Sequence, residues 1–453
     1  MNKSEQLCFR LIFCGIIFTP ITSLLINGKE MGMISEISNV FLFISFFIFA
    51  ITIILNKKKI FFPADNIMKY LILFYIFILL SGIFNVERIY TSKYASVLGI
   101  ERFFKISFGM YAYFLIYIFL YNIFYKYKGN VLIVLKDGLI MSFVLAVFYS
   151  IFEIGGGFLG IGWMLEVMEY ADSIIHPQLF VYRLRSVCLE PSFFAFFAAL
   201  VFPWLVSSIL TIQTKAKYIF MILSWCMLVM VVLTTSRSAY FMIGLECLFI
   251  FCNVKKYLHG RLLIPVMMLF FAIYLLIEYF SYELEYSFDL LSLLSTLFNL
   301  ESESNLARYG MAASAYSLFL DNPLFGVGLG QFVFRFGDSL PDFAYNSSEV
   351  VSCIVGTFPQ PMVHSLYARL LGEVGICGFL TWIMLWSYAV YRLVRCYCVS
   401  KDNKMKVLIG NFIICHLMLM FNWHSWDSMT NFIIWVFLAM DSVIIKKYGV
   451  EYA

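Results

Sequence analysis

Long apolar stretches recur along the whole chain, and short segments that hold most of the charges separate them. About 20 apolar residues are enough for one helix to cross a bilayer core that is roughly 30 Å thick. Within each stretch the apolar residues run continuously, which favours helices over alternating strands. The predicted spans are residues 8–27, 36–55, 67–86, 106–125, 134–154, 191–211, 218–235, 239–253, 262–280, 364–391, 407–423 and 429–445. The pattern predicts an all-α integral membrane protein with about twelve transmembrane helices.

The composition supports this interpretation. Of the 453 residues, 62% are hydrophobic and 13% are charged, whereas a soluble domain is about half apolar and a quarter charged. The first predicted span follows a short polar MNKSEQ without a small-residue cleavage site, so we expect an uncleaved helix. The sequence shows no soluble domain and no convincing internal repeat. We therefore predict a single polytopic membrane domain over residues 1–453.

Lysine and arginine are distributed differently between the two sides of the predicted bundle. With a cytoplasmic N-terminus, the inner loops hold 17 lysines and 3 arginines, and the outer segments hold 3 lysines and 8 arginines. Cytoplasmic loops carry an excess of positive charge, so we predict that both termini are cytoplasmic. The net charge of +4 is mostly this bias and does not indicate a nucleic-acid partner. The outer arginines are different, because rigid guanidinium groups suit phosphate and carboxylate recognition.

Two predicted outer loops are long, residues 155–190 and residues 281–363. The second lies between predicted helices nine and ten, and it sets nine acids against Arg308 and Arg335, for a net charge of −7. A loop of this length without secondary structure is unusual, and apolar residues recur in it at helical spacing. We predict a partly helical periplasmic loop that covers the outer membrane face.

The segment RLRSVCLEPSFFAFF, residues 183–197, places three charges at the outer mouth of the sixth predicted span. Pro191 suits the first position of a helix. In a structural interpretation, Arg183 and Arg185 anchor the helix end, and Glu190 lies near the positive end of the helix dipole. In a functional one, the arginines bind a phosphate and the carboxylate accepts a proton. The residues alone leave both interpretations open.

The segment TTSRSAY, residues 234–240, is a very short outer turn in which Arg237 is the only charge. An arginine at such depth is unfavourable unless it is paired or solvated. It either extends to the lipid phosphates or points into a polar cavity and holds an anionic substrate. The flanking hydroxyl side chains favour the second interpretation.

Arg308 precedes a glycine-rich turn, DNPLFGVGLGQF, which begins with an Asn-Pro step. No strand precedes the glycines and no Gly-Lys-Ser/Thr follows, so the turn matches neither a dinucleotide-binding nor a P-loop signature. We expect Gly326, Gly328 and Gly330 to permit a tight turn and close packing against the membrane helices.

The segment PQPMVHSLYARLLGEVGICGFL begins the tenth predicted span. Arg369 and Glu373 are four residues apart, hence on one helix face, where they can pair. His364 lies at the outer start of the span. Imidazole titrates near neutral pH, which makes His364 a candidate general acid or base. A histidine that merely lies at the interface is the alternative.

These four segments, in this order on a chain of about twelve spans, resemble the O-antigen polymerase and O-antigen ligase family. The matching sequences are RLRSVCLEPSFFAFF, TTSRSAYF, ARYGMAASAYSLFLDNPLFGVGLGQF and HSLYARLLGEVGICGFL. The long outer loop before the last spans is also similar to that family. The resemblance covers roughly residues 180–390.

The resemblance implies a helical membrane glycosyltransferase, similar to type C enzymes, on the outer face of the bacterial inner membrane. Its substrates would be glycans linked to undecaprenyl diphosphate, with a chain-length regulator and a flippase as partners in the same membrane. The family arginines that hold the diphosphate correspond to Arg237 and Arg308, with Arg185 as a third. The family histidine corresponds to His364, although Ser365 follows it where many members have asparagine. The resemblance implies neither a metal nor another cofactor.

The chemistry agrees with the residue pattern. Displacement of a lipid diphosphate builds negative charge on the leaving group, and fixed cations stabilise that charge. His364 or Glu190 is then the proton acceptor for the attacking hydroxyl, and Arg183, Arg369 and Glu373 are supporting residues. The Glu-Pro-Ser-Phe-Phe stretch looks more like polymerases of this family, so we favour a polymerase over a ligase. A lipid-linked oligosaccharide flippase is the alternative from another class, but it would carry charges along a path through the membrane.

Overall fold

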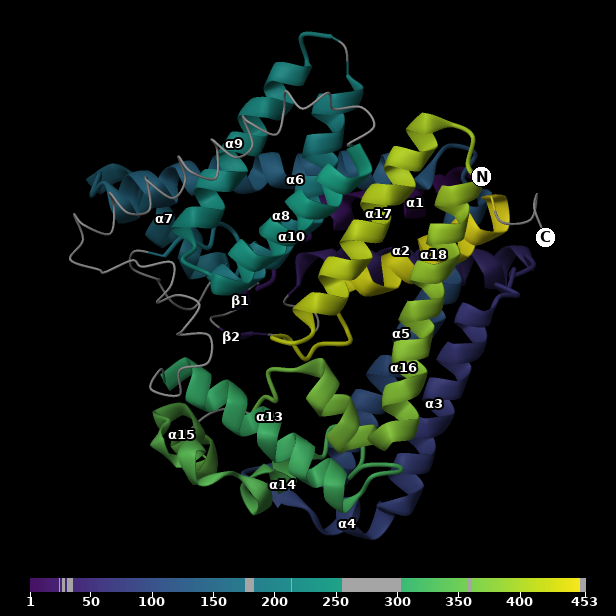
Figure 1. Cartoon of the computed structure of the whole chain (residues 1–453). Helices are drawn as coiled ribbons and strands as arrows, with labels where there is room; N and C mark the ends of the chain where they lie inside the picture. The colour runs from purple at the N-terminus through teal and green to yellow at the C-terminus, as the bar shows by residue number, and fades with distance from the viewer. Residues whose placement is uncertain are drawn as a thin grey trace.

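The computed structural model describes residues 1–23, 25–26, 29–30, 36–175, 183–212, 214–254, 303–356 and 361–448. In these ranges the chain is almost entirely helical, as Figure 1 shows. Seven of the described helices are long and apolar enough to cross a membrane. The prediction of an all-α integral membrane protein is thus confirmed, whereas the number twelve stays a prediction. The predicted ninth span, 262–280, lies outside the described residues.

The first predicted span, 8–27, is wrong at its C-terminal end. Helix α1 (Lys3–Ile17) begins with a capping box between Asn2 and Glu5 and ends before Phe18. Proline at position 20 lacks the N–H that a helix interior requires. Two short strands follow, β1 (Leu25–Ile26) and β2 (Lys29–Glu30), which pair in the antiparallel direction.

The next helices agree with the predicted spans to within a few residues, except that α5 begins earlier. They are α2 (Ile37–Asn56), α3 (Asn66–Phe84), α5 (Gly99–Lys126) and α6 (Val131–Glu153). A short helix, α4 (Val86–Thr91), and the strand pair β3 (Lys93–Tyr94) and β4 (Val97–Leu98) connect α3 to α5. The predicted loop 155–190 begins with a π-helical turn, η2 (Ile154–Phe158), followed by helix α7 (Gly162–Ile175).

The middle and last parts of the chain continue with helices. They are α8 (Pro191–Thr211), α9 (Lys217–Leu233), α10 (Arg237–Val254), α13 (Glu303–Asp321), α14 (Phe332–Arg335), α15 (Ser348–Val355), α16 (Leu366–Val399), α17 (Asn403–Asn422) and α18 (Phe432–Tyr448). Two 3-10 turns, η3 (Phe336–Ser339) and η4 (Asp342–Asn346), join α14 to α15. The described part of the predicted loop 281–363 is therefore partly helical, with the glycine-rich turn between α13 and α14.

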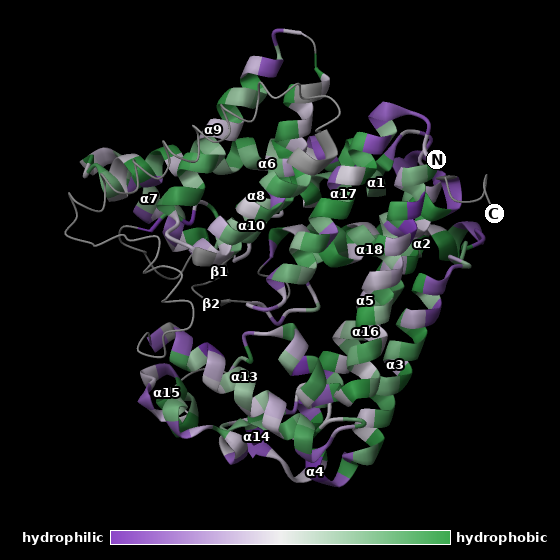
Figure 2. Cartoon of the chain, viewed as in Figure 1, coloured by the Kyte–Doolittle hydropathy of each residue, from purple (hydrophilic) through white to green (hydrophobic). Residues whose placement is uncertain are grey.

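The buried apolar side chains form two clusters. The large one lies between the long helices, where α3 packs on α16, α5 on α18, and α17 on α8. The small one lies among α13, α14 and α15, which form an outer layer at the end of the molecule remote from both termini (Figure 1). Figure 2 shows hydrophobic residues along α3, α5 and α16 and more hydrophilic ones at the two ends.

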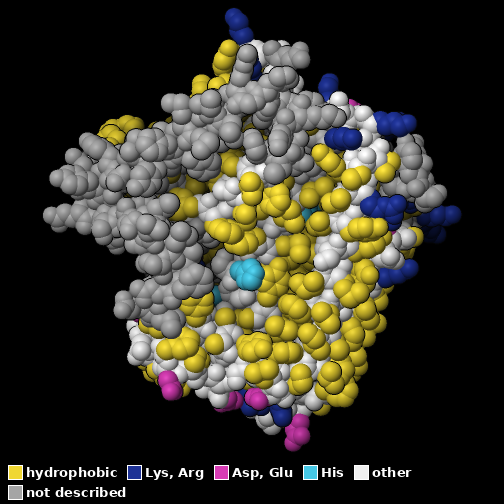
Figure 3. Space-filling model, in the orientation of Figure 1, with side chains coloured by type: hydrophobic (Ala, Val, Ile, Leu, Met, Phe, Trp, Pro, Cys, Tyr) yellow, Lys and Arg dark blue, Asp and Glu magenta, His cyan; other side chains and the backbone are white. Residues whose placement is uncertain are grey.

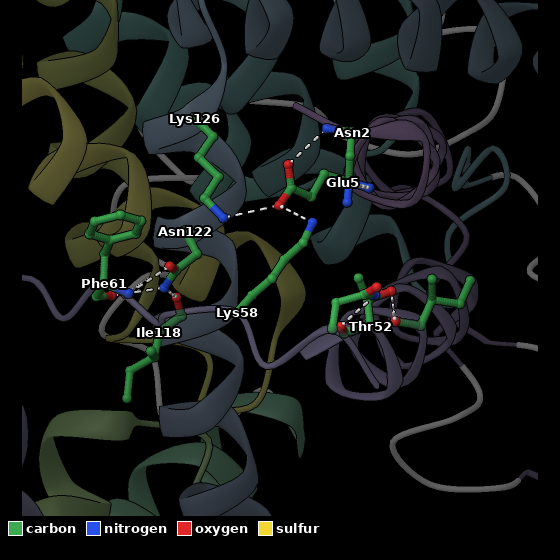
Figure 4. A network of polar contacts seen from close by, with 10 residues as sticks. Asn2, Glu5, Thr52, Lys58, Phe61, Ile118, Asn122 and Lys126 are labelled. Carbon is green, nitrogen blue, oxygen red and sulfur yellow. Dashed lines mark hydrogen bonds and ion pairs between the residues drawn. The ribbon is translucent and has the colours of Figure 1, made fainter. Parts of the chain in front are cut away.

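Charged side chains lie at both ends of the molecule. In Figure 3 lysine and arginine gather around the termini, and acidic side chains lie at the edge of the outer layer together with further lysine or arginine side chains. At the terminal end, Oε1 of Glu5 forms ion pairs with Nζ of Lys58 at 3.3 Å and Nζ of Lys126 at 3.0 Å (Figure 4). Hydrogen bonds also join Asn122 to the backbone of Phe61, so that α5 holds the α2–α3 connection.

Candidate functional site

The first two candidate segments lie side by side. The Leu184 amide donates to the Leu233 carbonyl at 2.9 Å, and Nε of Arg183 donates to the Thr235 hydroxyl at 2.8 Å. Residues 183–185 therefore run along the turn that joins α9 to α10. The structure thus brings together two motifs that are about fifty positions apart in the sequence.

Arg185 is buried in an ion pair. Its side chain is 2% exposed, and its Nη2 lies 2.5 Å from Oδ2 of Asp172 on α7. The backbone amides of Arg185 and Ser186 both donate to the Glu153 carboxylate, at 3.0 and 2.7 Å. Burial raises the pKa of the Asp172 carboxyl, and its hydrogen bonds and the guanidinium charge oppose that rise. Arg185 is therefore neutralised within the protein, and its contact with a diphosphate stays a prediction.

The turn before α10 is rich in hydroxyl groups. The Thr234 hydroxyl accepts from the Ser236 amide at 3.1 Å, and the Ser236 and Ser238 hydroxyls are 3.0 Å apart. Thr235 has a φ of 51°, a left-handed conformation that is uncommon for a β-branched residue. Arg237 begins α10, but its side chain lies outside the described part of the structure. Its predicted role in diphosphate binding stays a prediction.

The glycine-rich turn docks into a break in α16. Gly375 has a φ of 70°, which interrupts the helix and frees carbonyl groups from its ladder. The amides of Val327 and Gly328 donate to the carbonyls of Gly372 and Glu373, both at 2.9 Å. A Cβ atom at Gly326 would lie 2.5 Å from the backbone of Glu373. The predicted tight turn and close packing are confirmed.

An ion network lies just before this break. Nε of Arg369 donates to Oε2 of Glu373 at 3.0 Å, so the predicted pair is confirmed. Nη1 of Arg369 also donates to the Asp427 carbonyl at 2.9 Å. Arg102 on α5 donates to the Gly330 carbonyl at 2.8 Å. The network therefore connects the glycine-rich turn, α16 and the turn between α17 and α18.

His364 lies in a strained backbone position next to a carboxylate. Its φ of 59° is in the left-handed region, where a non-glycine residue is uncommon and often functional. Its Nε2 lies 3.4 Å from Oε1 of Glu349 on α15; the two side chains are 19% and 33% exposed. The interaction with His364 lowers the pKa of the Glu349 carboxyl, burial opposes this, and the positive charge of Arg308 on α13 adds to it. Glu349 therefore lies beside His364 and is close enough to Arg308 for that charge to lower its pKa, and we refer to these three residues as the His364 cluster.

Sequence reasoning missed Glu349, which it counted only as one of nine loop acids. Its sequence neighbours carry no signal, because it approaches His364 only through the docking of α15.

Glu190 was predicted as an alternative base. It precedes α8, is half-buried, and accepts from the Ser192 hydroxyl at 3.0 Å. Within the described ranges, no group of three or more His, Cys, Asp or Glu residues is arranged to hold a metal ion.

Arg308 lies in the third of the four motifs, and His364 and the break in α16 lie in the fourth. Residues 222–383 match the O-Antigen ligase family model. This match confirms the predicted resemblance over most of the motif-bearing region. It includes α13, the glycine-rich turn and His364, but not Arg183 or Arg185.

A curated relative gives a second comparison. The chain is 26% identical over 139 residues to the teichuronic acid biosynthesis protein TuaE of Bacillus subtilis (strain 168), which covers 30% of this chain. The match spans about a quarter of that protein's length, 26%. Both similarities cover only part of the chain, one to a family described as O-Antigen ligase and the other to a protein named for teichuronic acid biosynthesis.

Proposed function

We propose that the protein is a polysaccharide polymerase of the O-antigen type. It transfers a glycan from undecaprenyl diphosphate to a hydroxyl group of a second lipid-linked repeat unit, with inversion at the anomeric carbon. The observation that carries this proposal is the contact of His364 with Glu349, whose pKa is also lowered by the positive charge of Arg308. An imidazole and a permanent cation near the same carboxylate are the two kinds of group that a metal-independent transfer requires.

The proposed reaction uses these residues in distinct roles. His364 accepts the proton of the acceptor hydroxyl as its oxygen attacks the anomeric carbon. The bond from that carbon to the diphosphate oxygen breaks, and its electron pair stays on the diphosphate. Arg308, together with Arg237, stabilises the charge that develops there. Glu349 stabilises the imidazolium that forms, because a carboxylate beside one ring nitrogen favours protonation of the ring.

We also propose that the outer layer faces the periplasm of the inner membrane and that both termini are cytoplasmic. Lysine and arginine side chains gather at the terminal end (Figure 3), where Lys58 and Lys126 both pair with Glu5. The positive-inside rule assigns such an end to the cytoplasm. A flippase that delivers the lipid-linked substrate and a chain-length regulator are the expected partners in this membrane.

A ligase that transfers the finished polymer to lipid A-core is the second candidate. The description of the matching family favours it. The Glu-Pro-Ser-Phe-Phe sequence of residues 190–194 favours the polymerase. Both activities would use the same cluster, since both displace a lipid diphosphate.

Deletion of the gene separates the candidates. If the protein is a polymerase, the surface polysaccharide loses its length ladder on a gel, and single repeat units remain. If it is a ligase, polymer accumulates on the lipid carrier and none is attached. Complementation with His364→Ala should restore nothing, whereas Arg335→Ala, at an arginine that pairs with Asp338 on the surface, should restore the ladder. An unchanged profile in the deletion strain would contradict both activities.

A further inference from the structure

A cavity opens between the segment after α1, the residue before α2, the first turns of α8 and the turn between α17 and α18. Its empty volume, including the open mouth, is about 570 Å³. Most of its lining is apolar, and part of the apolar surface is aromatic. The polar groups that line it include the side chains of Glu36, Ser428 and Asn431. Neither the family match nor the curated relative assigns a ligand to it.

Aromatic rings form one wall of the cavity. The ring centroids of Phe193 and Phe196 lie 6.2 and 5.6 Å from that of Trp426. All three side chains line the cavity, and Trp426 is half-buried. A ligand with one apolar face and a polar edge matches such a wall with nearby polar groups. A pyranose ring has this form, since its C–H groups cover one face and its hydroxyls surround the edge.

Glu36 is the acidic group of the cavity. Its carboxylate accepts from Nδ2 of Asn39 at 3.0 Å and from the backbone amide of Phe432 at the start of α18. Burial raises the pKa of the Glu36 carboxyl to about 8, in spite of these hydrogen bonds. A carboxyl that is largely neutral at pH 7 can both donate to and accept from a sugar hydroxyl, and it offers little charge to a cation.

Hydrogen bonds to the backbone of the residues around His364 connect it to the cavity. The Leu366 amide donates to the carbonyls of Trp423 and Trp426, at 2.9 and 3.1 Å. On the other side of His364, the Val363 amide donates to Oδ2 of Asp427 at 3.1 Å. The turn that carries Trp426 therefore holds the backbone on both sides of the strained histidine.

We propose that this cavity binds one sugar ring of the glycan substrate, with Trp426 stacked on the ring and Glu36 hydrogen-bonded to its hydroxyls. The inference rests on the proposed function, because it identifies a subsite for that substrate. The sugar belongs either to the acceptor or to the donor glycan, which have the same chemistry.

The test uses the full-length protein, purified in detergent. The probe is the repeat-unit oligosaccharide released by mild acid from lipid-linked glycan of the deletion strain. We expect Trp426→Leu, which keeps an apolar side chain but loses the ring face, to weaken binding of this probe about tenfold. Glu36→Ala should weaken it further. The matched control is Trp225→Leu, at a tryptophan on α9 that is 47% exposed, which should bind as the wild type does.

Removal of the non-reducing terminal sugar from the probe distinguishes the two glycans. Loss of binding assigns the cavity to the acceptor end, and retained binding assigns it to the donor sugar. Equal binding by the wild type and by Trp426→Leu and Glu36→Ala, with unchanged thermal unfolding, would overturn the subsite. Displacement of the probe by undecaprenyl phosphate alone would overturn it too, because the cavity would then hold the lipid. An unchanged polysaccharide profile in the deletion strain would instead contradict the proposed function.

Discussion

Arg185 and Arg308 both belong to the predicted outer segments, but the structure gives them opposite surroundings. Arg185 is 2% exposed and paired with Asp172, and its backbone is bound by Glu153. Arg308 is half-buried, and its charge lowers the pKa of Glu349, which lies beside His364. A buried, neutralised guanidinium holds segments together, whereas the partly exposed one is the arginine that we propose for substrate binding. The comparison teaches that a predicted position on the outer face does not by itself indicate function.

The largest expected effect is on activity at Arg308. Arg308→Met should lower the rate of glycan transfer by about 10² to 10³, because it removes a cation that stabilises the leaving diphosphate. Transfer by the purified protein on lipid-linked repeat units measures this, and thermal unfolding measures folding. We expect unfolding to stay as in the wild type. If the variant lost stability but kept full specific activity, Arg308 would be a structural residue and not a substrate-binding one.

The next effect is on stability at Arg185. Arg185→Met should destabilise the fold by about 3 to 5 kcal/mol, because it leaves the buried Asp172 carboxylate without its partner. The double variant Arg185→Met with Asp172→Leu should recover most of this loss. Chemical unfolding of the purified variants measures both changes. A stable single variant that has lost transfer activity would show that Arg185 serves the substrate directly.

A smaller effect is expected at the break in α16. Gly375→Ala should destabilise the outer layer by about 1 to 3 kcal/mol, because the φ of 70° is strained for alanine and a Cβ would overlap the backbone of Leu324. Gly337→Ala is the matched control, since nothing lies within 4 Å of its added Cβ. Limited proteolysis of the outer layer and unfolding report the difference. Equal behaviour of the two variants would contradict the proposed docking.

The smallest effect concerns pH. The interaction with His364 and the charge of Arg308 lower the pKa of Glu349 in the folded state, so this carboxylate contributes stability above its ordinary pKa. That contribution is lost as the pH falls through the lowered value. Wild type should therefore exceed Glu349→Gln in thermal stability at neutral pH, and the two should converge in acid. A difference that does not shrink as the pH falls below the ordinary pKa of a glutamate would contradict this sign.

Local patterns predicted much of the fold. Continuous apolar stretches located α2, α3, α8 and α17, because the length of a membrane helix is set by the bilayer. The spacing of Arg369 and Glu373 predicted their pair, and alternating glycines predicted the tight turn. The end of α1 was missed, because the apolar residues continue past Pro20 while the helix does not.

Long-range contacts were less accessible to sequence reasoning. The Arg185–Asp172 pair needs α7 to fold back on the segment before α8, and nothing near either residue indicates this. Glu349 looked like one solvated loop acid among many. Both contacts depend on which helices pack against each other. The spacing of apolar residues does not specify this. The strained φ of His364 likewise has no signature in the sequence.

The break at Gly375 has a consequence for how such proteins diversify. The glycine-rich turn is fastened to α16 by amide and carbonyl groups of the main chain, which every residue type except proline can supply in full. The anchor therefore tolerates substitution on the exposed faces of α13 to α15. An outer layer taken from a relative with another glycan could be seated on the same helix, provided that the glycines at the joint are retained.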